Sequence, residues 1–369
     1  MSKIHYGLVW MYLLGTLTPL LGQSLRNFEE EFIEIIAKSR AAAVSIEIVS
    51  KQTGNNRLNS GILLDQEGHI VTVANSLKDQ QKVAVWLESR QQYEARVVGT
   101  DPHTNIAVLK IDAPDLMPVK QGYSGDLRVG AFLIIIGNPY GLAKSVSYGI
   151  TSGLNRAVWL EGQGAPITGL IQTNASISPG DAGGLVVDSQ GKFIGMVSST
   201  LSRNLMWSGS HNAVLQKLKT VLKQSSHATQ MPDAEVVKIL EIVLQQLPGN
   251  AIGSQGINFI LPSATIYWVA EQIIKQGEVH RGWIGVDVKD SDAGDGVVVT
   301  HVVPDSPAAH SDIKIDDRLT VIDGETIVNS LTLLHRISHA STGQTVTFTI
   351  IRSQEKLTVA LQLGKNPKK

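Results

Sequence analysis

Short apolar runs separated by turn residues dominate the chain from about residue 44 to residue 199. Examples are "KVAVWLE", "IAVLKI" and "GAFLIIIGNP", each of strand length and each bounded or followed by Gly, Pro, Asp or Ser. An amphipathic helix would instead repeat its apolar residues every three or four positions over a longer stretch. The pattern therefore predicts an all-β barrel or sandwich in this part of the chain.

Residues 203–255 break this rhythm and predict an inserted helical hairpin. Two sets of apolar residues each fall on one helical face, and Asp233 is suited to cap the second helix, which "PGN" ends. The sets are Val214, Leu215, Leu218, Val221 and Leu222, and then Val236, Ile239, Leu240, Val243, Leu244 and Leu247. Periodicity leaves three roles open for the hairpin: packing on the outside of the barrel, covering a cleft, or binding a partner.

The two ends of the chain form separate units. At the start, Lys3 precedes an apolar run from about Tyr6 to Leu21, which is typical of an export signal and shorter than a spanning helix. Export to the periplasm or the outside is expected, and an uncleaved N-terminal anchor is the alternative. At the other end, short strands return with one helix near residues 331–340. The predicted domains are 1–23 (signal or anchor), 24–280 (β domain with the insertion) and 281–365.

Composition narrows the function. The chain has 369 residues, 43% of them hydrophobic, with a formal net charge of −1 and no cysteine. This balance is typical of a globular protein with a sizeable core, and it gives no electrostatic reason to expect nucleic acid or an anionic membrane as partner. Disulfides, thiolate chemistry and cysteine-bound zinc are excluded. No cofactor and no metal site is predicted.

The stretch "ISPGDAGGLVV", residues 177–187, carries the candidate chemistry. Glycine-flanked turns of this kind present the nucleophile of serine proteases, but position 182 is alanine. Such an enzyme also needs a base within hydrogen-bond reach, a group that orients the base, and backbone N–H groups aimed at the developing oxyanion. These parts lie far apart in the sequence and meet only on folding.

Several stretches, in order, resemble the HtrA (DegP-like) family. They include "SGILLDQEGHIVT", "TNIAVLKI", "LRVGAFLIIIGNPYGL", "GLIQTNASISPGDAGG" and "GINFILPSATIYWVAEQIIKQGEVHRGWIGV", and the resemblance covers about Phe32 to Gly364. It implies a mainly β fold: a trypsin-like double β-barrel followed by a PDZ domain. The resemblance also implies a homotrimer that forms through the protease domains, with a contribution from the segment before Val44. Mixed assembly with an active relative is the alternative.

The resemblance places Asn75, Asn105 and Ala182 where family members carry the His, Asp and Ser of the catalytic triad. A methyl group cannot attack a carbonyl, and an amide cannot accept and return a proton near neutral pH as imidazole can. The chain is therefore predicted to be no enzyme but a catalytically degenerate member, a pseudoprotease. The alternative is a serine-type endopeptidase that uses unrecognised residues, for which His69, His103, Ser176 and Ser178 are the candidates.

Two backbone-based sites do not depend on these side chains. The turn at Gly180, Asp181 and Ala182 is expected to keep an oxyanion-hole remnant, because backbone donors need no side chain; the alternative is that its glycines serve only the fold. In "RGWIGV" the residues stand where PDZ domains of the family bind a C-terminal carboxylate. The candidate peptide-binding residues are Trp283, Ile284, Gly285 and Val286, with Leu333 and Ile337 as pocket or, alternatively, plain core residues.

The expected function is that of a non-catalytic HtrA-like protein. It would bind polypeptides or C-terminal peptides as a chaperone, adaptor or scaffold. A structural or decaying gene product without a ligand is a further alternative.

Overall fold

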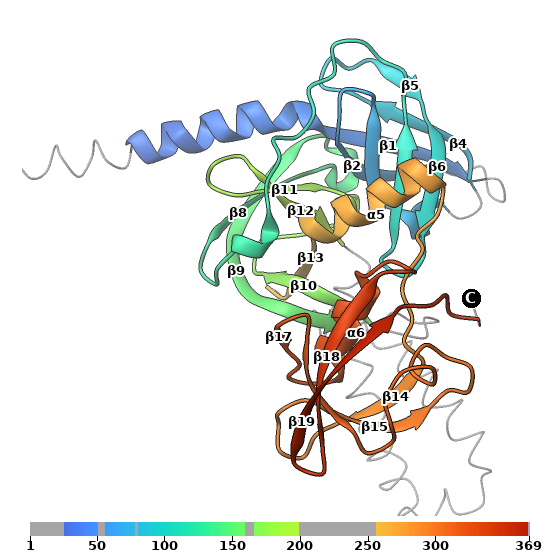
Figure 1. Cartoon of the computed structure of the whole chain (residues 1–369). Helices are drawn as coiled ribbons and strands as arrows, with labels where there is room; N and C mark the ends of the chain where they lie inside the picture. The colour runs from blue at the N-terminus through green and yellow to red at the C-terminus, as the bar shows by residue number, and fades with distance from the viewer. Residues whose placement is uncertain (1–25, 51–55, 78–79, 159–165, 199–255, 368–369) are drawn as a thin grey trace, which may run out of the picture.

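The computed structural model describes residues 26–50, 56–77, 80–158, 166–198 and 256–367. The predicted signal segment, residues 1–23, and the predicted helical hairpin, about 203–255, lie outside the described residues. Figure 1 shows a β-rich body with a helix projecting from it and a smaller domain below.

The first half of the body is a seven-stranded antiparallel sheet in which alternate apolar side chains face a shared interior. Its order is β5-β4-β1-β2-β3-β7-β6. Ile46, Ile70 and Leu109 come from three different strands and are fully buried in one cluster. The strands are β1 (Ala43–Ser50), β2 (Asn56–Leu63), β3 (His69–Val73), β4 (Gln80–Trp86), β5 (Gln92–Glu94), β6 (Arg96–Asp101) and β7 (Ile106–Lys110).

The second half is a closed barrel in the order β10-β13-β12-β11-β8-β9. The uninterrupted apolar run of β8 is buried on both faces, which explains why its sequence does not alternate. The strands are β8 (Phe132–Gly137), β9 (Ser145–Val158), β10 (Ile167–Thr173), β11 (Leu185–Val187), β12 (Phe193–Val197) and β13 (Asn258–Pro262). Short 3-10 turns connect the strands: η1 (Arg40–Ala42), η2 (Ala74–Leu77), η3 (Ser124–Asp126) and η4 (Pro139–Gly141).

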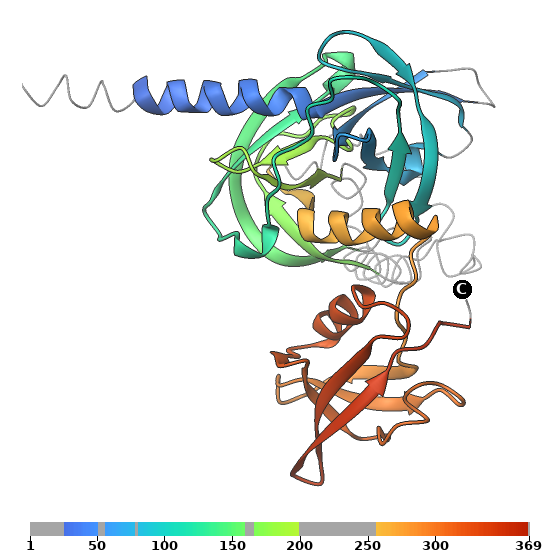
Figure 2. The same cartoon turned by 45° about the horizontal axis from the view of Figure 1, so that its top comes forward.

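Two helices accompany the body. The N-terminal helix, residues 26–39, leads into η1 and extends away from the barrel (Figures 1 and 2). Helix α5 (Ser263–Gln276) contacts β6, β7 and β12, so it joins the two halves. Its buried residues Ile266, Val269, Ala270 and Ile273 follow the helical spacing of an apolar stripe. Gly277, at φ 81°, ends the helix, and its N–H bonds to the Ile273 carbonyl at 2.8 Å.

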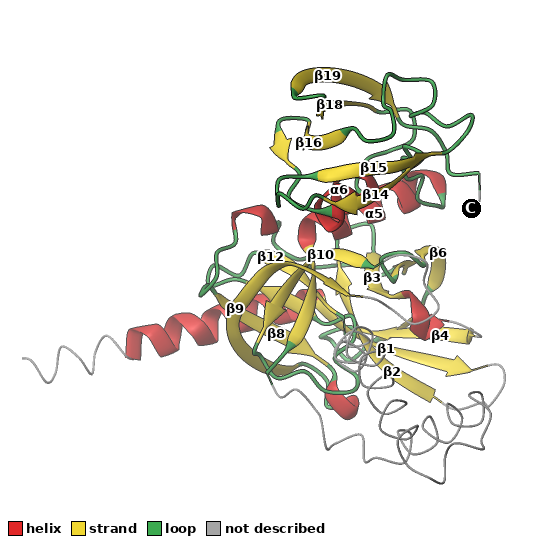
Figure 3. Cartoon of the chain, turned by 90° about the horizontal axis from the view of Figure 1, so that it is seen from below, coloured by secondary structure: helices red, strands yellow, loops and turns green. Residues whose placement is uncertain are grey.

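The smaller domain is an antiparallel sheet in the order β14-β15-β16-β18-β19, with β17 beside β16 and helix α6 packed against it. Asn329 caps α6 because its side chain accepts a 3.0 Å hydrogen bond from the Thr332 N–H. The elements are β14 (Val286–Asp290), β15 (Val297–Val302), β16 (Arg318–Ile322), β17 (Glu325–Thr326), α6 (Ser330–Ser338), β18 (Thr345–Arg352) and β19 (Glu355–Gln362). Figure 3, coloured by secondary structure, shows α6 on the side of this domain that faces the barrel.

The predicted fold class is confirmed: the chain is mainly β, with a trypsin-like body followed by a PDZ domain. Within the described ranges, no helix is both long and apolar enough to cross a membrane.

Candidate functional site

The structure brings Asn75 and Asn105, the first two positions that the resemblance assigns to the triad, into contact. Asn75 lies in η2, directly after β3, and Asn105 lies in the turn between β6 and β7. The Asn75 N–H donates to Asn105 Oδ1 at 2.8 Å, and the Ala74 N–H donates to the Asn105 carbonyl at 2.9 Å. Asn105 has φ 60°, a left-handed conformation that asparagine tolerates better than most residues. Its amide therefore acts here as a turn-forming group that holds η2 in place.

Strand β2 connects Ala182, the third position that the resemblance assigns to the triad, with the first. The Ser60 N–H donates to the Ala182 carbonyl at 2.9 Å, and Ser60 Oγ donates to the Gly180 carbonyl at 2.8 Å. The neighbouring Asn59 bonds through its side chain to Ser76, the residue next to Asn75. All three positions therefore lie around the middle of β2, where the two halves of the body meet.

The glycines of the turn are required by its geometry. A Cβ on Gly183 would lie 2.1 Å from the Ser60 carbonyl oxygen, and one on Gly180 would lie 2.3 Å from that of Asn138. Both glycines also have positive φ, at 85° and 102°. Ala182 is 7% exposed, and its methyl group belongs to the apolar core of the body.

Two backbone donors of this turn are available. The N–H groups of Asp181, Gly183 and Gly184 bond to backbone carbonyls at 2.7–3.0 Å. In the hydrogen bonding of the described residues, those of Gly180 and Ala182 have no acceptor. Burial raises the pKa of the Asp181 carboxyl, and the hydrogen bond from the Ser178 N–H lowers it in part.

The four alternative residues lie in other settings. His69 Nδ1 pairs with Asp65 at 2.7 Å, at the opposite end of β3 from Asn75. The His103 N–H donates to Asp101 at 3.3 Å, in the turn before Asn105. The Ser178 N–H donates to Asp181 at 2.8 Å, and the carbonyl of Ser176 accepts from Ser147 Oγ at 2.7 Å. None of these four contacts joins one of the histidines to one of the serines.

The loop that precedes β14 in the PDZ domain has the backbone form of a carboxylate-binding loop. The carbonyls of Ile284 and Gly285 point inward, accepting from the N–H groups of Ala308 and Val303, each at 2.9 Å. Their own N–H groups have no partner among the described residues. Gly285 has φ 81°, and a Cβ there would lie 2.1 Å from Ser306 Cβ. Trp283 fixes the start of the loop through mutual backbone bonds with Gly364 at 2.9 and 3.0 Å.

The other predicted groove residues lie in or beside the apolar core of the domain. Leu333 and Ile337 are 4% and 8% exposed and pack in the same apolar cluster as Ile284, with Val286 at its edge. Strand β14 is the edge strand of its sheet, so one side of its backbone is free to pair with an added strand. The arrangement can receive an extended chain between β14 and α6.

The contact between α6 and the body was not predicted from the sequence. The contact consists of residues from three parts of the chain: His335 of α6 and its C-cap residue His339, Arg281 of the linker, and Asp101, Thr168 and Thr265 of the body. The spacing of two histidines by four residues on a helix was the only signal for it. In the same described ranges, no group of three His, Asp or Glu side chains is placed to hold a metal ion.

Comparison with known proteins agrees with this geometry. Residues 59–196 match the model of the trypsin-like peptidase domain, and residues 282–363 match that of the PDZ domain. The chain is thus a trypsin-like domain joined to a PDZ domain. A probable periplasmic serine endoprotease, DegP-like, from Pseudomonas fulva is 28% identical over 86% of this chain and 58% of its own length. The chain spans little more than half of that relative.

Further similarity extends over nearly the whole chain. The chloroplastic Protease Do-like 1 of Arabidopsis thaliana is 26% identical over 93% of this chain and 72% of its own length. Among solved structures, the HtrA-type protease AlgW with tripeptide has a TM-score of 0.66 at 24% identity, covering 91% of this chain and 97% of that one. The chain belongs to the HtrA family.

The prediction that the chain is no enzyme is contradicted by these comparisons, because the relatives are named as serine endoproteases and HtrA-type proteases. The prediction rested on three side chains alone. What the chain shares with those enzymes is the trypsin-like domain that contains these three positions, over residues 59–196.

Proposed function

We propose that this HtrA-family protein captures polypeptides by their C-terminal ends in the PDZ groove. The observation that carries the proposal is the loop Trp283–Val286, with two open N–H groups beside a free strand edge. A carboxylate accepts hydrogen bonds from such N–H groups, while the residues before it pair with β14 as an extra strand. Leu333 and Ile337 would provide an apolar pocket for the last side chain.

The substitution Gly285→Ala tests this proposal. The added methyl group would meet Ser306 and strain the positive φ, so the loop must shift and its N–H groups lose their alignment. Affinity for C-terminal peptides, measured by fluorescence anisotropy with a library of free-carboxylate peptides, is expected to fall about tenfold or more, the worth of one or two charge-assisted hydrogen bonds.

Gly294→Ala is the matched control, because Gly294 also has positive φ (70°) but has no atom within 4 Å of an added Cβ. The same peptides with a C-terminal carboxamide are the second control. Equal binding of carboxylate and carboxamide peptides would overturn the proposal.

We also propose that the chain works after export, as a chaperone, adaptor or scaffold for its bound polypeptides. The periplasmic relatives and the signal-like apolar start support an exported location. An assay of aggregation of an unfolded client protein, with and without the chain, tests the chaperone role.

A second candidate function is polypeptide cleavage, which the names of the relatives favour. Position 182 offers only a methyl group, so the attacking atom would have to come from another residue or from water. Turnover of casein by purified chain, compared with the Gly285→Ala variant, tests it. Repeated turnover would establish cleavage, and binding without turnover would leave capture as the function.

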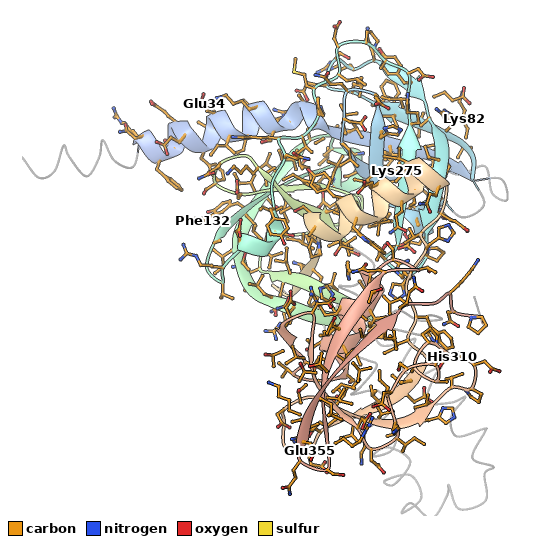
Figure 4. All side chains as sticks on the ribbon, viewed as in Figure 1. Glu34, Lys82, Phe132, Lys275, His310 and Glu355 are labelled. Carbon is orange, nitrogen blue, oxygen red and sulfur yellow. The ribbon has the colours of Figure 1, made fainter. Side chains whose placement is uncertain are left out.

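The assembly implied by the family resemblance is proposed as a homotrimer. An aromatic surface near the N-terminal helix supports it: Phe28, Phe132 and Tyr148 are 52%, 48% and 65% exposed. Phe28 lies 6.3 Å from Phe132, and Phe32 lies 5.7 Å from Tyr148, between ring centroids. Figure 4 shows Phe132 at the edge of the barrel below this helix. Aromatic side chains gathered in this way mark an association surface.

Replacing Phe28 and Phe132 together by serine is expected to shift the trimer towards single chains by at least about tenfold in the association constant, since two large apolar contacts are lost. Sedimentation velocity measures the shift. Ile315→Ser, at a residue 55% exposed in the PDZ domain, is the control. A single-chain mass for the parent protein would contradict the proposal.

A further inference from the structure

Helix α6 is both a wall of the PDZ groove and the element by which the PDZ domain contacts the body. Leu333 and Ile337 face the PDZ core, while α6 also contacts β10 of the barrel. Figures 1 and 2 both show α6 between the two domains. The side chains directed to the body are His335 and His339, one helical turn apart, with ring centroids separated by 4.4 Å.

His335 is fitted into β10. Its Nδ1 lies 3.1 Å from Thr168 Oγ1. The next residue, Gly169, has φ 75°, and a Cβ there would lie 2.4 Å from the imidazole Cε1. A side chain at position 169 would thus push the imidazole away, so the backbone of β10 is shaped to receive it.

His339 is fixed between α6 and α5. Its Nδ1 lies 2.8 Å from the His335 carbonyl, and its Nε2 lies 2.9 Å from Thr265 Oγ1. A carbonyl only accepts, so Nδ1 carries the proton, and the unprotonated Nε2 accepts from the Thr265 hydroxyl. With a second proton on the ring, Nε2 would donate and the hydroxyl would accept, so both hydrogen bonds can form in either protonation state. What disfavours the imidazolium here is the burial of the ring and the positive charge of Arg281 and Arg336.

The charges around this pair offer little compensation for an imidazolium. The nearest acidic group, Asp101, is already engaged by Arg281 through two hydrogen bonds of 2.7 and 2.6 Å. The Arg281 guanidinium also lies over the Trp268 ring, 5.4 Å from its centroid. The charged or titratable groups facing the pair within the described ranges are Arg336 of α6 with its partner Glu325, Glu278, His280 and Arg281 of the linker, and Asp101 and His103 of the body.

We propose that Thr168, Thr265, His335 and His339 form a pH-operated dock, which holds the PDZ domain against the body while both imidazoles are neutral and releases it when they are protonated. We call these four residues the histidine dock. Two imidazolium rings at this separation would repel each other, next to Arg336 and Arg281, in a site where both rings are half-buried.

The direction of the pH dependence follows from burial. Burial lowers the pKa of His335 to about 4, helped by His339 and Arg336. Burial also lowers the pKa of His339, although its hydrogen bond to the His335 carbonyl acts in the opposite direction. Because the docked state has the lower pKa, docking is complete above the ordinary histidine value of about 6.5 and is lost as the pH falls below it.

The size of the effect can be calculated for His335. If its pKa returns to the ordinary value on release, the docking equilibrium falls about 30-fold between pH 8 and pH 5, and His339 adds to this. The ion pair between Arg281 and Asp101 survives over this range. Burial would raise the pKa of Asp101, but the hydrogen bonds from Arg281 hold it below its usual value. The released domain therefore stays tethered at the linker.

Double electron–electron resonance on the full chain tests the dock. The chain lacks cysteine, so nitroxides attach only at introduced positions, Lys82→Cys on β4 and Glu355→Cys at the start of β19. Figure 4 shows both positions on opposite domains. We expect one narrow distance distribution at pH 8 and a broad one at pH 5. The variant His335→Asn with His339→Gln, which keeps hydrogen-bonding atoms but cannot titrate, is expected to give the same distribution at both pH values.

His310→Gln is the matched control, because His310 is an exposed histidine of the PDZ domain (Figure 4); it should leave the pH response unchanged. Identical distributions of the parent at pH 8 and pH 5 would overturn the proposal, as would an unaltered pH response of the double variant. If that variant does not fold, an NMR titration of the parent with assigned histidine signals tests the proposal instead. Titration of His335 and His339 near pH 6.5 would overturn the proposal, and titration of both well below pH 6.5 would support it.

Discussion

A chain that carries Asn75→His, Asn105→Asp and Ala182→Ser together is expected to hydrolyse a peptide substrate at least about a thousandfold faster than the parent. A complete triad raises the rate of hydrolysis by several orders of magnitude above the rate of a site that has backbone donors alone. The backbone is already arranged for it: the Asn75 N–H lies 2.8 Å from Asn105 Oδ1, and the N–H groups of Gly180 and Ala182 have no acceptor in the part of the chain that the structure describes. Initial rates with a fluorogenic peptide measure the gain.

The matched control is the variant that carries only the first two substitutions. It restores the base and its orienting carboxylate but leaves a methyl group at position 182, so the gain should be far smaller. Equal rates for the triple variant and the parent would show that the three positions do not meet in a working geometry.

The substitution Arg281→Met is expected to destabilise the chain by about 3–5 kcal/mol, because it leaves a buried carboxylate without its cation. Asp101 is 4% exposed, and its remaining side-chain partner is Thr104. Chemical unfolding followed by tryptophan fluorescence measures the loss. Trp268 lies directly under the guanidinium, so its emission also reports the local contact.

The double variant Asp101→Leu with Arg281→Met is the control, since replacing both partners by apolar side chains is often nearly neutral. It should recover most of the lost stability. If Arg281→Met unfolded at the same denaturant concentration as the parent, the ion pair would not stabilise the chain.

The fold was predictable from the sequence because its main signals are local. The short apolar runs with Gly, Pro and Asp at their ends mark strands, and the helix α5 follows the apolar spacing of "IYWVAEQII". The turn at residues 180–184 could be located from its glycines, since only glycine adopts the backbone that the close approach of Ser60 and Asn138 requires.

The features that could not be predicted from the sequence depend on contacts between residues that are distant along the chain. The link between Ala182 and Asn75 passes through β2, more than a hundred residues before the turn, and no local pattern predicts it. The contact of Thr168 with His335 joins two domains. The prediction about enzymatic class failed for a different reason. It was based on three side chains alone, although the chain shares its fold with serine endoproteases.

The free edge of β14 also has a consequence for solubility. A strand edge that remains open for a ligand is equally open to the same strand of a second copy, which would join two chains edge to edge. The outward side chains of β14 counter this, because Asp287, Lys289 and Asp290 are exposed and place charge along the edge. Strand β14 can thus pair with an extended peptide, while its charged side chains repel strand β14 of a second copy.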